Sequence, residues 1–198
     1  LLMWWGTLSG PVAPPGDYTV ALAVDGDTLV SSFEVLMDPR AECSREDRIA
    51  QFEFLKSIRD KVDETHDAIR HMRSVKSQVS GLLGRLDEDD YPAIFEEAHA
   101  LDSLMTAVEE VLYQTKLKSN QDMLNFPIKL NNKLAHVGSL ASMGVYAPTE
   151  QMVQVRDEVT ALVDVELAKW HALRDERLPA FNALIRDSAI DLIGVPEE

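Results

Sequence analysis

The chain has 198 residues, with 19 lysines and arginines against 34 aspartates and glutamates, and so a formal net charge of −15 with histidine neutral. The low sequence pI of about 4.7 argues against nucleic-acid binding and against anionic membrane surfaces, because both need clustered cations. Hydrophobic residues make up 45% of the chain, which suffices for a core in one or two domains and makes general disorder unexpected.

The first five residues, Leu1–Trp5, are apolar. They are too few, and too poor in basic residues, for a secretory signal peptide, so we expect a β-strand from a longer chain. No run of 18 apolar residues is available to insert into a membrane. Cys43 is the single cysteine, which excludes an internal disulfide.

A β-hairpin is predicted next. Larger apolar residues alternate with smaller ones at Tyr18, Val20, Leu22 and Val24. Asp25-Gly26 then favours a two-residue turn, because both residues tolerate positive φ. The second strand is predicted from Thr28 to Met37, with one face made of Leu29, Phe33, Val35 and Met37. Two strands alone are marginal in water, so residues 3–5, further strands or a helix should cover the apolar face.

From Ser44 onward the apolar period becomes helical. Ser44 and Asp47 resemble a capping box, and the first helix should run from Ser44 to about Ser80. A second helix should begin at a cap on Asp90, with Pro92 in its first turn, and end near Lys116. Its buried stripe is predicted to contain Ile94, Ala98, Leu101, Met105, Val108 and Leu112.

Two more helices complete the predicted bundle. The third carries Leu130, Leu134, Val137 and Leu140, with Gly144 as its C′ residue. The fourth opens at Pro148-Thr149, and Pro179 should bend or break it before a last helical segment. Its stripe is predicted to contain Met152, Val155, Val159, Leu162, Leu167, Trp170 and Leu173. Because the first helix is much longer than the third, part of it should project or pack on the hairpin.

Two sequence motifs in the predicted helices raise the possibility of a metal site in the bundle. Glu96 with His99, and Asp63 with His66, form the carboxylate-x-x-His pairs found in di-metal bundles. At 100° per residue, however, Glu96 points about 200° away from Ile94, and Asp63 lies off the apolar stripe of its own helix. We therefore expect both pairs to lie on solvated faces.

The remaining polar candidates are assigned no chemistry. The acidic run from Asp87 to Asp90 lacks the glycine and distal glutamate of a calcium-binding EF-hand loop. Cys43 precedes a capped helix, and we expect it to be a spectator thiol. The histidines lie in no catalytic signature; they are His66, His71, His99, His136 and His171. Accordingly, no residue is predicted to be catalytic, to bind a cofactor or to bind a metal.

Two stretches resemble known families. Gly10-Pro11-Val12-Ala13-Pro14-Pro15-Gly16-Asp17-Tyr18-Thr19-Val20, together with Val24-Asp25-Gly26, is similar to the hairpin signature of FlgD-like immunoglobulin-type modules. The segments Tyr113–Lys116 and Asp122–Leu134, with Asn125-Phe126-Pro127 and Asn131-Asn132-Lys133, resemble the C-terminal helical region of large bacterial propeller proteins. These proteins are named BNR-repeat glycosyl hydrolases or VPS10/sortilin-like proteins.

The hairpin and the four helices with short connections predict an α+β fold, mostly α, with an antiparallel four-helix bundle in residues 41–198. The resemblance implies that residues 1–40 are a partial immunoglobulin-like β module. The resemblance also implies a secreted or cell-envelope location in bacteria. The Asp-box repeats of the propeller blades are absent from this sequence, so no hydrolase residue carries over.

The predicted function is that of a non-catalytic accessory region that packs on an upstream propeller of the same polypeptide or binds a protein partner. Two alternatives stay open. The region could belong to a glycoside hydrolase whose active site lies in the propeller. It could also be a carbohydrate-binding module, for which Trp4-Trp5 would offer a stacking platform, although strand residues in a core are the expected role of this pair.

Overall fold

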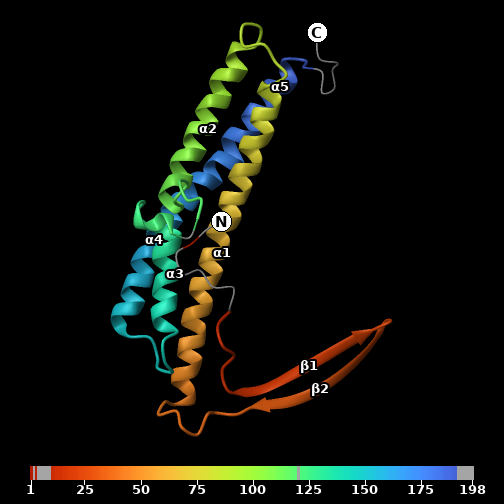
Figure 1. Cartoon of the computed structure of the whole chain (residues 1–198). Coiled ribbons are helices and arrows are strands. Elements are labelled where there is room, and N and C mark those ends of the chain that lie inside the picture. Colours follow the sequence, from red (N-terminus) through yellow and green to blue (C-terminus); the bar gives the residue numbers. More distant parts are fainter. Residues whose placement is uncertain (2, 4–9, 120, 191–198) are drawn as a thin grey trace.

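The computed structural model describes residues 1, 3, 10–119 and 121–190. A two-stranded antiparallel hairpin precedes a long helical bundle, which confirms the predicted α+β, mostly α class (Figure 1). In chain order the elements are β1 (Gly16–Val24), β2 (Asp27–Val35), α1 (Arg45–Leu83), α2 (Pro92–Leu112), the 3-10 turn η1 (Asp122–Leu124), α3 (Leu130–Ala141), α4 (Glu150–Ala172), the π turn η2 (Leu173–Arg177) and α5 (Leu178–Asp187).

The hairpin turns where the sequence predicts. Asp25 and Gly26 have φ values of 53° and 92°, and Val24 pairs directly with Asp27. The second strand ends at Val35, two residues before the predicted Met37, and Val35 pairs with Gly16 at the start of β1. Pro14 and Pro15 precede Gly16 and have no N–H groups to donate, so the ladder cannot continue along β2.

Helix α1 begins at the predicted capping box. The Asp47 backbone N–H donates to Ser44 Oγ at 3.0 Å, and the Ser44 N–H donates to Asp47 Oδ2 at 2.9 Å. The Ser44 backbone N–H, followed by the Ser44 hydroxyl, holds the pKa of the Asp47 carboxyl below its usual value. The helix continues past the predicted Ser80 to Leu83, because Gly81 is tolerated in the last turn and Gly84 forms the C-cap.

Both ends of α2 differ from the prediction. Tyr91, not Asp90, is the N-cap, because Pro92 takes the first helical position and holds the residue before it out of the helical region. The helix ends at Leu112, before the predicted Lys116. There Tyr113 turns to an extended conformation, and both Tyr113 and Gln114 are buried.

Helices α2 and α3 follow one another along the same side of α1 (Figure 1). The late part of α1 contacts α2, where Arg73 pairs with Glu109. The early part contacts α3 through Ile58, whose side chain lies against Gly138. The prediction that part of α1 would project or pack on the hairpin is therefore wrong for most of the helix, because two shorter helices in series cover its length; Arg45, its first residue, does reach the base of the hairpin.

The core lies along the middle of the bundle. Ile69, Met72 and Leu134 are wholly buried, as are Leu112 and Val163. Three residues of the predicted buried stripes are instead exposed: Leu140, Val155 and Leu162. In α4 the buried side is rotated toward Val163, Glu166 and Leu167, so the exposed aliphatic residues of this helix form a second stripe.

The ends of α3 and α4 are mostly as predicted. Gly144 has a positive φ of 93°, but Ser142 is the C-cap of α3, so Gly144 lies one residue beyond the predicted C′ position. Thr149 caps α4 by accepting a hydrogen bond from the Met152 N–H. Instead of breaking at Pro179, the chain widens into the π turn just before this proline, which lacks the N–H of a regular helical turn.

Candidate functional site

The hairpin presents one apolar face. Cross-strand pairing places Tyr18 opposite Phe33 and Leu22 opposite Leu29. Since side chains alternate along a strand, one face collects the apolar residues. We call it the apolar hairpin face; it comprises Tyr18, Val20, Leu22, Val24, Leu29, Phe33 and Val35. The opposite face is mostly polar or small, and Val30 is its larger aliphatic residue.

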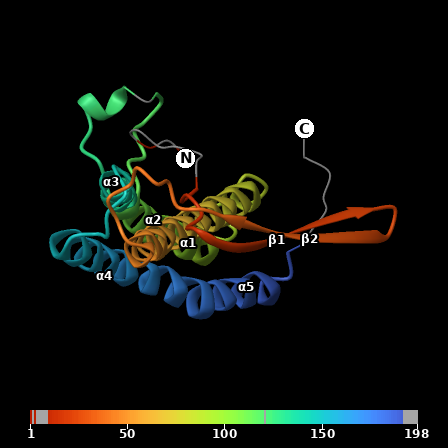
Figure 2. The same cartoon turned by 90° about the horizontal axis from the view of Figure 1, so that it is seen from below.

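No described helix covers the apolar hairpin face. The hairpin projects sideways from the base of the bundle in both views, and no described helix packs along its strands (Figures 1 and 2). Leu29 is 72% exposed and Phe33 is 50% exposed. At the base of the hairpin, Arg45 Nε donates to the Pro15 carbonyl at 3.2 Å. The face thus stays open to solvent or to another protein.

The predicted cover from residues 3–5 is not found in the described part of the chain. Met3 packs against the helical core and not on the hairpin. Trp4 and Trp5 lie outside the described residues, so their assignment to a strand or to a sugar platform stays a prediction. Tyr18 and Phe33 stack on one another across the strands, with ring centroids 5.9 Å apart.

The two carboxylate–histidine pairs are far apart. Lys76 of α1 contacts Asp102 of α2 at 3.3 Å, and Asp63 precedes Lys76 by about 20 Å of helix. Glu96 lies beyond Asp102 in the opposite direction, because α1 and α2 are antiparallel. Glu96 and Asp63 are both exposed, as their helical phase predicts. Across the described residues no cluster of three or more metal-binding side chains forms.

The other polar candidates lie apart as well. Residues 87–90 are exposed, and Asp87 Oδ1 accepts a hydrogen bond from the Asp89 N–H at 2.9 Å within its own turn. Cys43 is half-buried beside the α1 cap. His99 is exposed, with its ring edge toward Phe95. These residues are not brought together with one another into a catalytic arrangement.

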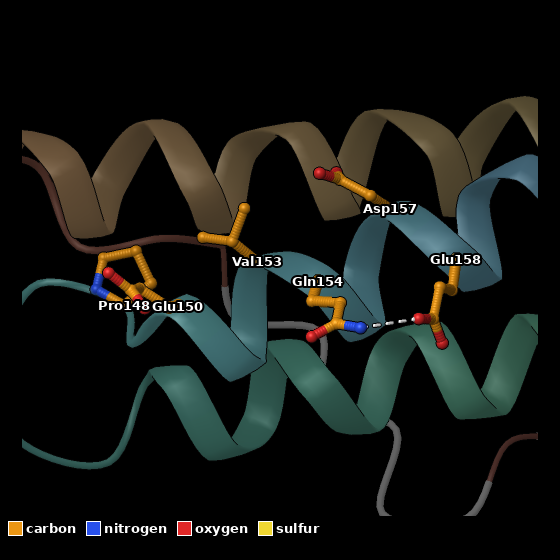
Figure 3. A pocket seen from close by; sticks show the side chains of 6 residues that line it. All are labelled: Pro148, Glu150, Val153, Gln154, Asp157 and Glu158. Atoms are coloured by element: carbon orange, nitrogen blue, oxygen red, sulfur yellow. Dashed lines mark hydrogen bonds between the residues drawn. The ribbon is translucent and has the colours of Figure 1, made fainter.

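A hollow near the start of α4 is also acidic. It is lined by Pro148, Glu150, Val153, Gln154, Asp157 and Glu158. Gln154 Nε2 donates to Glu158 Oε1 at 3.0 Å, and Figure 3 shows the carboxylates spread along the helix instead of converging. One helix supplies nearly all of this lining, so the hollow has no second wall to orient a ligand.

A group of buried polar residues, which we call the polar junction, lies at the connection between α2 and α3. Gln114 Nε2 donates to the Pro127 carbonyl at 2.9 Å and closes the intervening loop. Asn131, at the start of α3, is 2% exposed, and its amide lies 3.1 Å from Nε2 of His66. Burial lowers the pKa of His66 to about 4, with smaller contributions from the Leu1 ammonium and the Arg70 guanidinium. The imidazole is therefore neutral and accepts the Asn131 amide hydrogen bond.

Arg73 extends this junction. Its Nε donates to buried Glu109 at 2.7 Å, and its guanidinium lies 5.1 Å from the centre of the Tyr113 ring. The sequence pattern predicts no role for Arg73, Glu109 or Tyr113. Gln114 and Asn131 fall inside the segments that carry the family resemblance. His66 with Asn131, and Arg73 with Glu109, join residues of different helices, so only the tertiary structure shows these pairings. We assign the junction a structural role, since it joins α2, α3 and α1.

Among the described residues no helix is both long and apolar enough to cross a bilayer. A scan against protein-family models found no match, and searches of curated proteins and of solved structures found none either. The resemblance to propeller proteins stays a prediction. The molecule's own surfaces are thus the basis for a functional conclusion, and the apolar hairpin face is the candidate site.

Proposed function

We propose that this chain is a non-catalytic association region that acts through the apolar hairpin face. The observation that carries the proposal is an ordered hairpin whose aliphatic and aromatic side chains are uncovered on one side. Val20, Leu22 and Val24 are each more than half exposed. Contiguous apolar surface of this kind is typical of protein–protein contacts.

The shape of the face indicates the kind of surface that fits it. Each strand has 9 residues, so the ribbon is about 30 Å long at 3.3 Å per residue. An isolated two-stranded hairpin is at best marginally stable in water, whereas two sheets that pack face to face bury the inner side chains of both. The proposed partner surface is therefore the apolar face of another β-sheet.

In the wider proposal, this chain is the C-terminal accessory region of a larger bacterial propeller protein of the BNR or VPS10-like kind. The partner sheet would then belong to the same polypeptide, in a secreted or cell-envelope protein. The family resemblance supports this part of the proposal, as does the order of a hairpin followed by helices. A parent glycoside hydrolase would keep its active site in the propeller.

Neighbouring residues on opposite faces provide a matched test in the full-length natural polypeptide. Leu29→Lys introduces a charge into the apolar hairpin face, whereas Val30→Lys introduces it on the other face. Hydrogen exchange of the β1 amides should be slow in the unmodified protein, faster in Leu29→Lys and little changed in Val30→Lys. Equal exchange in the full-length protein and the 198-residue chain would overturn the proposal.

A separate assay tests the proposal that the chain is not catalytic. Purified chain should release no product from aryl glycosides, sialosides or xyloglucan, measured by chromogenic or reducing-sugar assay. Turnover that disappears on substitution of one carboxylate, with the fold retained by circular dichroism, would contradict the proposal.

A further inference from the structure

The backbone edge of β2 is a second uncovered feature of the hairpin. Val24 and Asp27 flank the two-residue turn, so they exchange both of their backbone hydrogen bonds, and inward and outward residues alternate from there along the ladder. This register points the backbone N–H and C=O groups of every second residue of β2 away from β1. The outward-facing residues are Thr28, Val30, Ser32 and Glu34. The outer edge of β2 is therefore a row of hydrogen-bond donors and acceptors.

Nothing in the described part of the chain pairs with this row. The sheet has two strands, and no described backbone hydrogen bond outside the ladder involves residues 27–35. Every residue of β2 except Val35 is exposed. The register is continuous from one end of the hairpin to the other, without a bulge, so the open edge is as long as the strand.

The edge of β2 also lacks the features that usually block the addition of another strand. Folded proteins protect an exposed edge with lysine, proline or a bulge. The strand contains neither a lysine nor a proline, and Glu34, near the base of the hairpin, is the one charged residue among its outward-facing positions. Thr28 and Val30 are β-branched and favour an extended backbone. The edge is thus suited to pairing.

The outer edge of β1 is different, because the segment before it guards its base. Pro14 and Pro15 have no N–H groups to offer to another strand. The Pro14 carbonyl accepts a hydrogen bond from the Tyr18 hydroxyl at 2.6 Å, and the Pro15 carbonyl accepts one from Arg45. A strand laid along β1 would meet these contacts, whereas the edge of β2 is open along its length among the described residues.

We infer that a β-strand of the partner adds to the outer edge of β2. This inference rests on the proposed function, because the strand belongs to the same partner whose sheet covers the apolar hairpin face. The partner then completes the β module twice over: its strand becomes the third strand of the hairpin's own sheet, and its second sheet packs on the apolar face. The side chains of the added strand alternate, with the apolar ones on the side of Leu29 and Phe33.

The backbone pattern of the edge selects a strand over other occupants. Its outward-facing residues recur about 6.6 Å apart at 3.3 Å per residue, which is the repeat of another extended chain. A helix pairs its backbone groups internally and offers no such row. A second copy of this chain has a β2 edge of its own, but each copy carries a net charge of −15, which opposes their approach.

Hydrogen exchange at single residues tests the edge separately from the face. In the full-length natural polypeptide, the outward amides of Val30 and Ser32 should exchange at least about 100-fold more slowly than in the 198-residue chain, because the added strand accepts their hydrogen bonds. The inward amides of Leu29 and Phe33, which are bonded to β1, report on the cover of the face. Slowing of the inward amides alone would keep the proposed function and overturn strand addition, whereas slowing of neither set would overturn both.

Ser32→Pro is the matched variant for this edge, and Thr19→Pro is its control. The two residues lie opposite one another in the register, and each proline removes an N–H that points outward, one at each edge. In the full-length polypeptide, Ser32→Pro should speed exchange at Val30 at least about tenfold, whereas Thr19→Pro should change it less than about threefold. Equal acceleration by both variants would overturn the inference. Slowing of the Val30 amide with rising concentration of the 198-residue chain would assign the edge to a second copy and also overturn it.

Discussion

The hairpin and the bundle are built from equally regular apolar patterns but bury them to very different degrees. Leu134 of α3 is completely buried, whereas Leu22 of β1 is 57% exposed. Both residues lie where their period predicts an inward-facing side chain. The difference teaches that the hydrophobic period of the sequence determines which face of a helix or strand is apolar. Whether that face is buried depends on a second element that packs against it.

Hydrogen exchange should give the largest difference between the two regions. Amides from Thr19 to Val24 should exchange at least about 1,000-fold faster than those from Leu101 to Leu112 in the 198-residue chain, because local opening of an uncovered hairpin breaks few apolar contacts. Exchange followed by mass spectrometry after proteolysis measures both. Equal protection would mean that the hairpin is covered in solution.

Two leucine-to-alanine changes should sharpen the comparison. Leu134→Ala should lower the free energy of unfolding by about 3 kcal/mol, since it leaves a cavity at a wholly buried position. Leu22→Ala should lower it by less than about 0.5 kcal/mol, as expected of an exposed position. Urea unfolding followed by helical circular dichroism measures both, and a large loss in Leu22→Ala would show that the hairpin supports the bundle.

Acid should destabilise the bundle through His66. The pKa of this histidine is lowered from about 6.5 to about 4 on folding, mainly by burial. The unfolded chain then binds the proton more readily, so stability is lost as the pH falls from about 6.5 toward 4 and is unaffected by this group above 6.5. The loss should be on the order of 2 kcal/mol after allowance for partial solvent access.

His66→Gln is the control for this pH dependence. The glutamine carbonyl can still accept the Asn131 hydrogen bond but cannot take up a proton. Urea unfolding at pH 4.5 and pH 7.5 should therefore differ less in the variant than in the unmodified chain. An unchanged difference would assign the acid sensitivity to other groups.

The smallest effect is expected at the hairpin turn. Gly26 has a φ of 92°, so Gly26→Ala strains the turn by about 1 kcal/mol. Since no helix packs along the hairpin, which meets α1 at its base through Arg45, the melting temperature of the helices should stay within about 1 °C, even though exchange of the hairpin amides becomes faster. A clear fall in helical melting temperature would show that the two regions unfold together.

Local chemistry was predictable from the sequence. The Ser44 cap, the Asp25-Gly26 turn and the Thr149 cap each depend on neighbouring residues, and the structure confirms them. The alternation of the hairpin likewise predicted the composition of its apolar face. The candidate site was therefore visible as a pattern, while its lack of a covering helix was not.

Contacts between distant residues were not predictable in this way. Gln51 of α1 is buried because its side chain donates to the Ala141 carbonyl at 2.7 Å, 90 positions away, and so completes the end of α3. The serial arrangement of α2 and α3 and the burial of Glu166 depend in the same way on helix placement. The helical period alone also predicted a buried Leu162, which is exposed, because apolar residues occur on more than one side of α4.

The π turn before Pro179 has a consequence for how this helix can change in evolution. Its Leu178 N–H reaches back to the Leu173 carbonyl, one residue farther than in an α-helix, so the turn accommodates one additional residue. Trp170 before the turn and Phe181 after it are both buried, so the helix presents an inward face on both sides of the π turn. Because the wide turn takes up the additional residue, a lineage that lost a single residue here would replace the π turn with regular α-helix and keep α5 on the side that it now presents. The same deletion in the regular part of α4 would instead rotate everything after it, including the Arg177 pairing with Glu97, by about 100°.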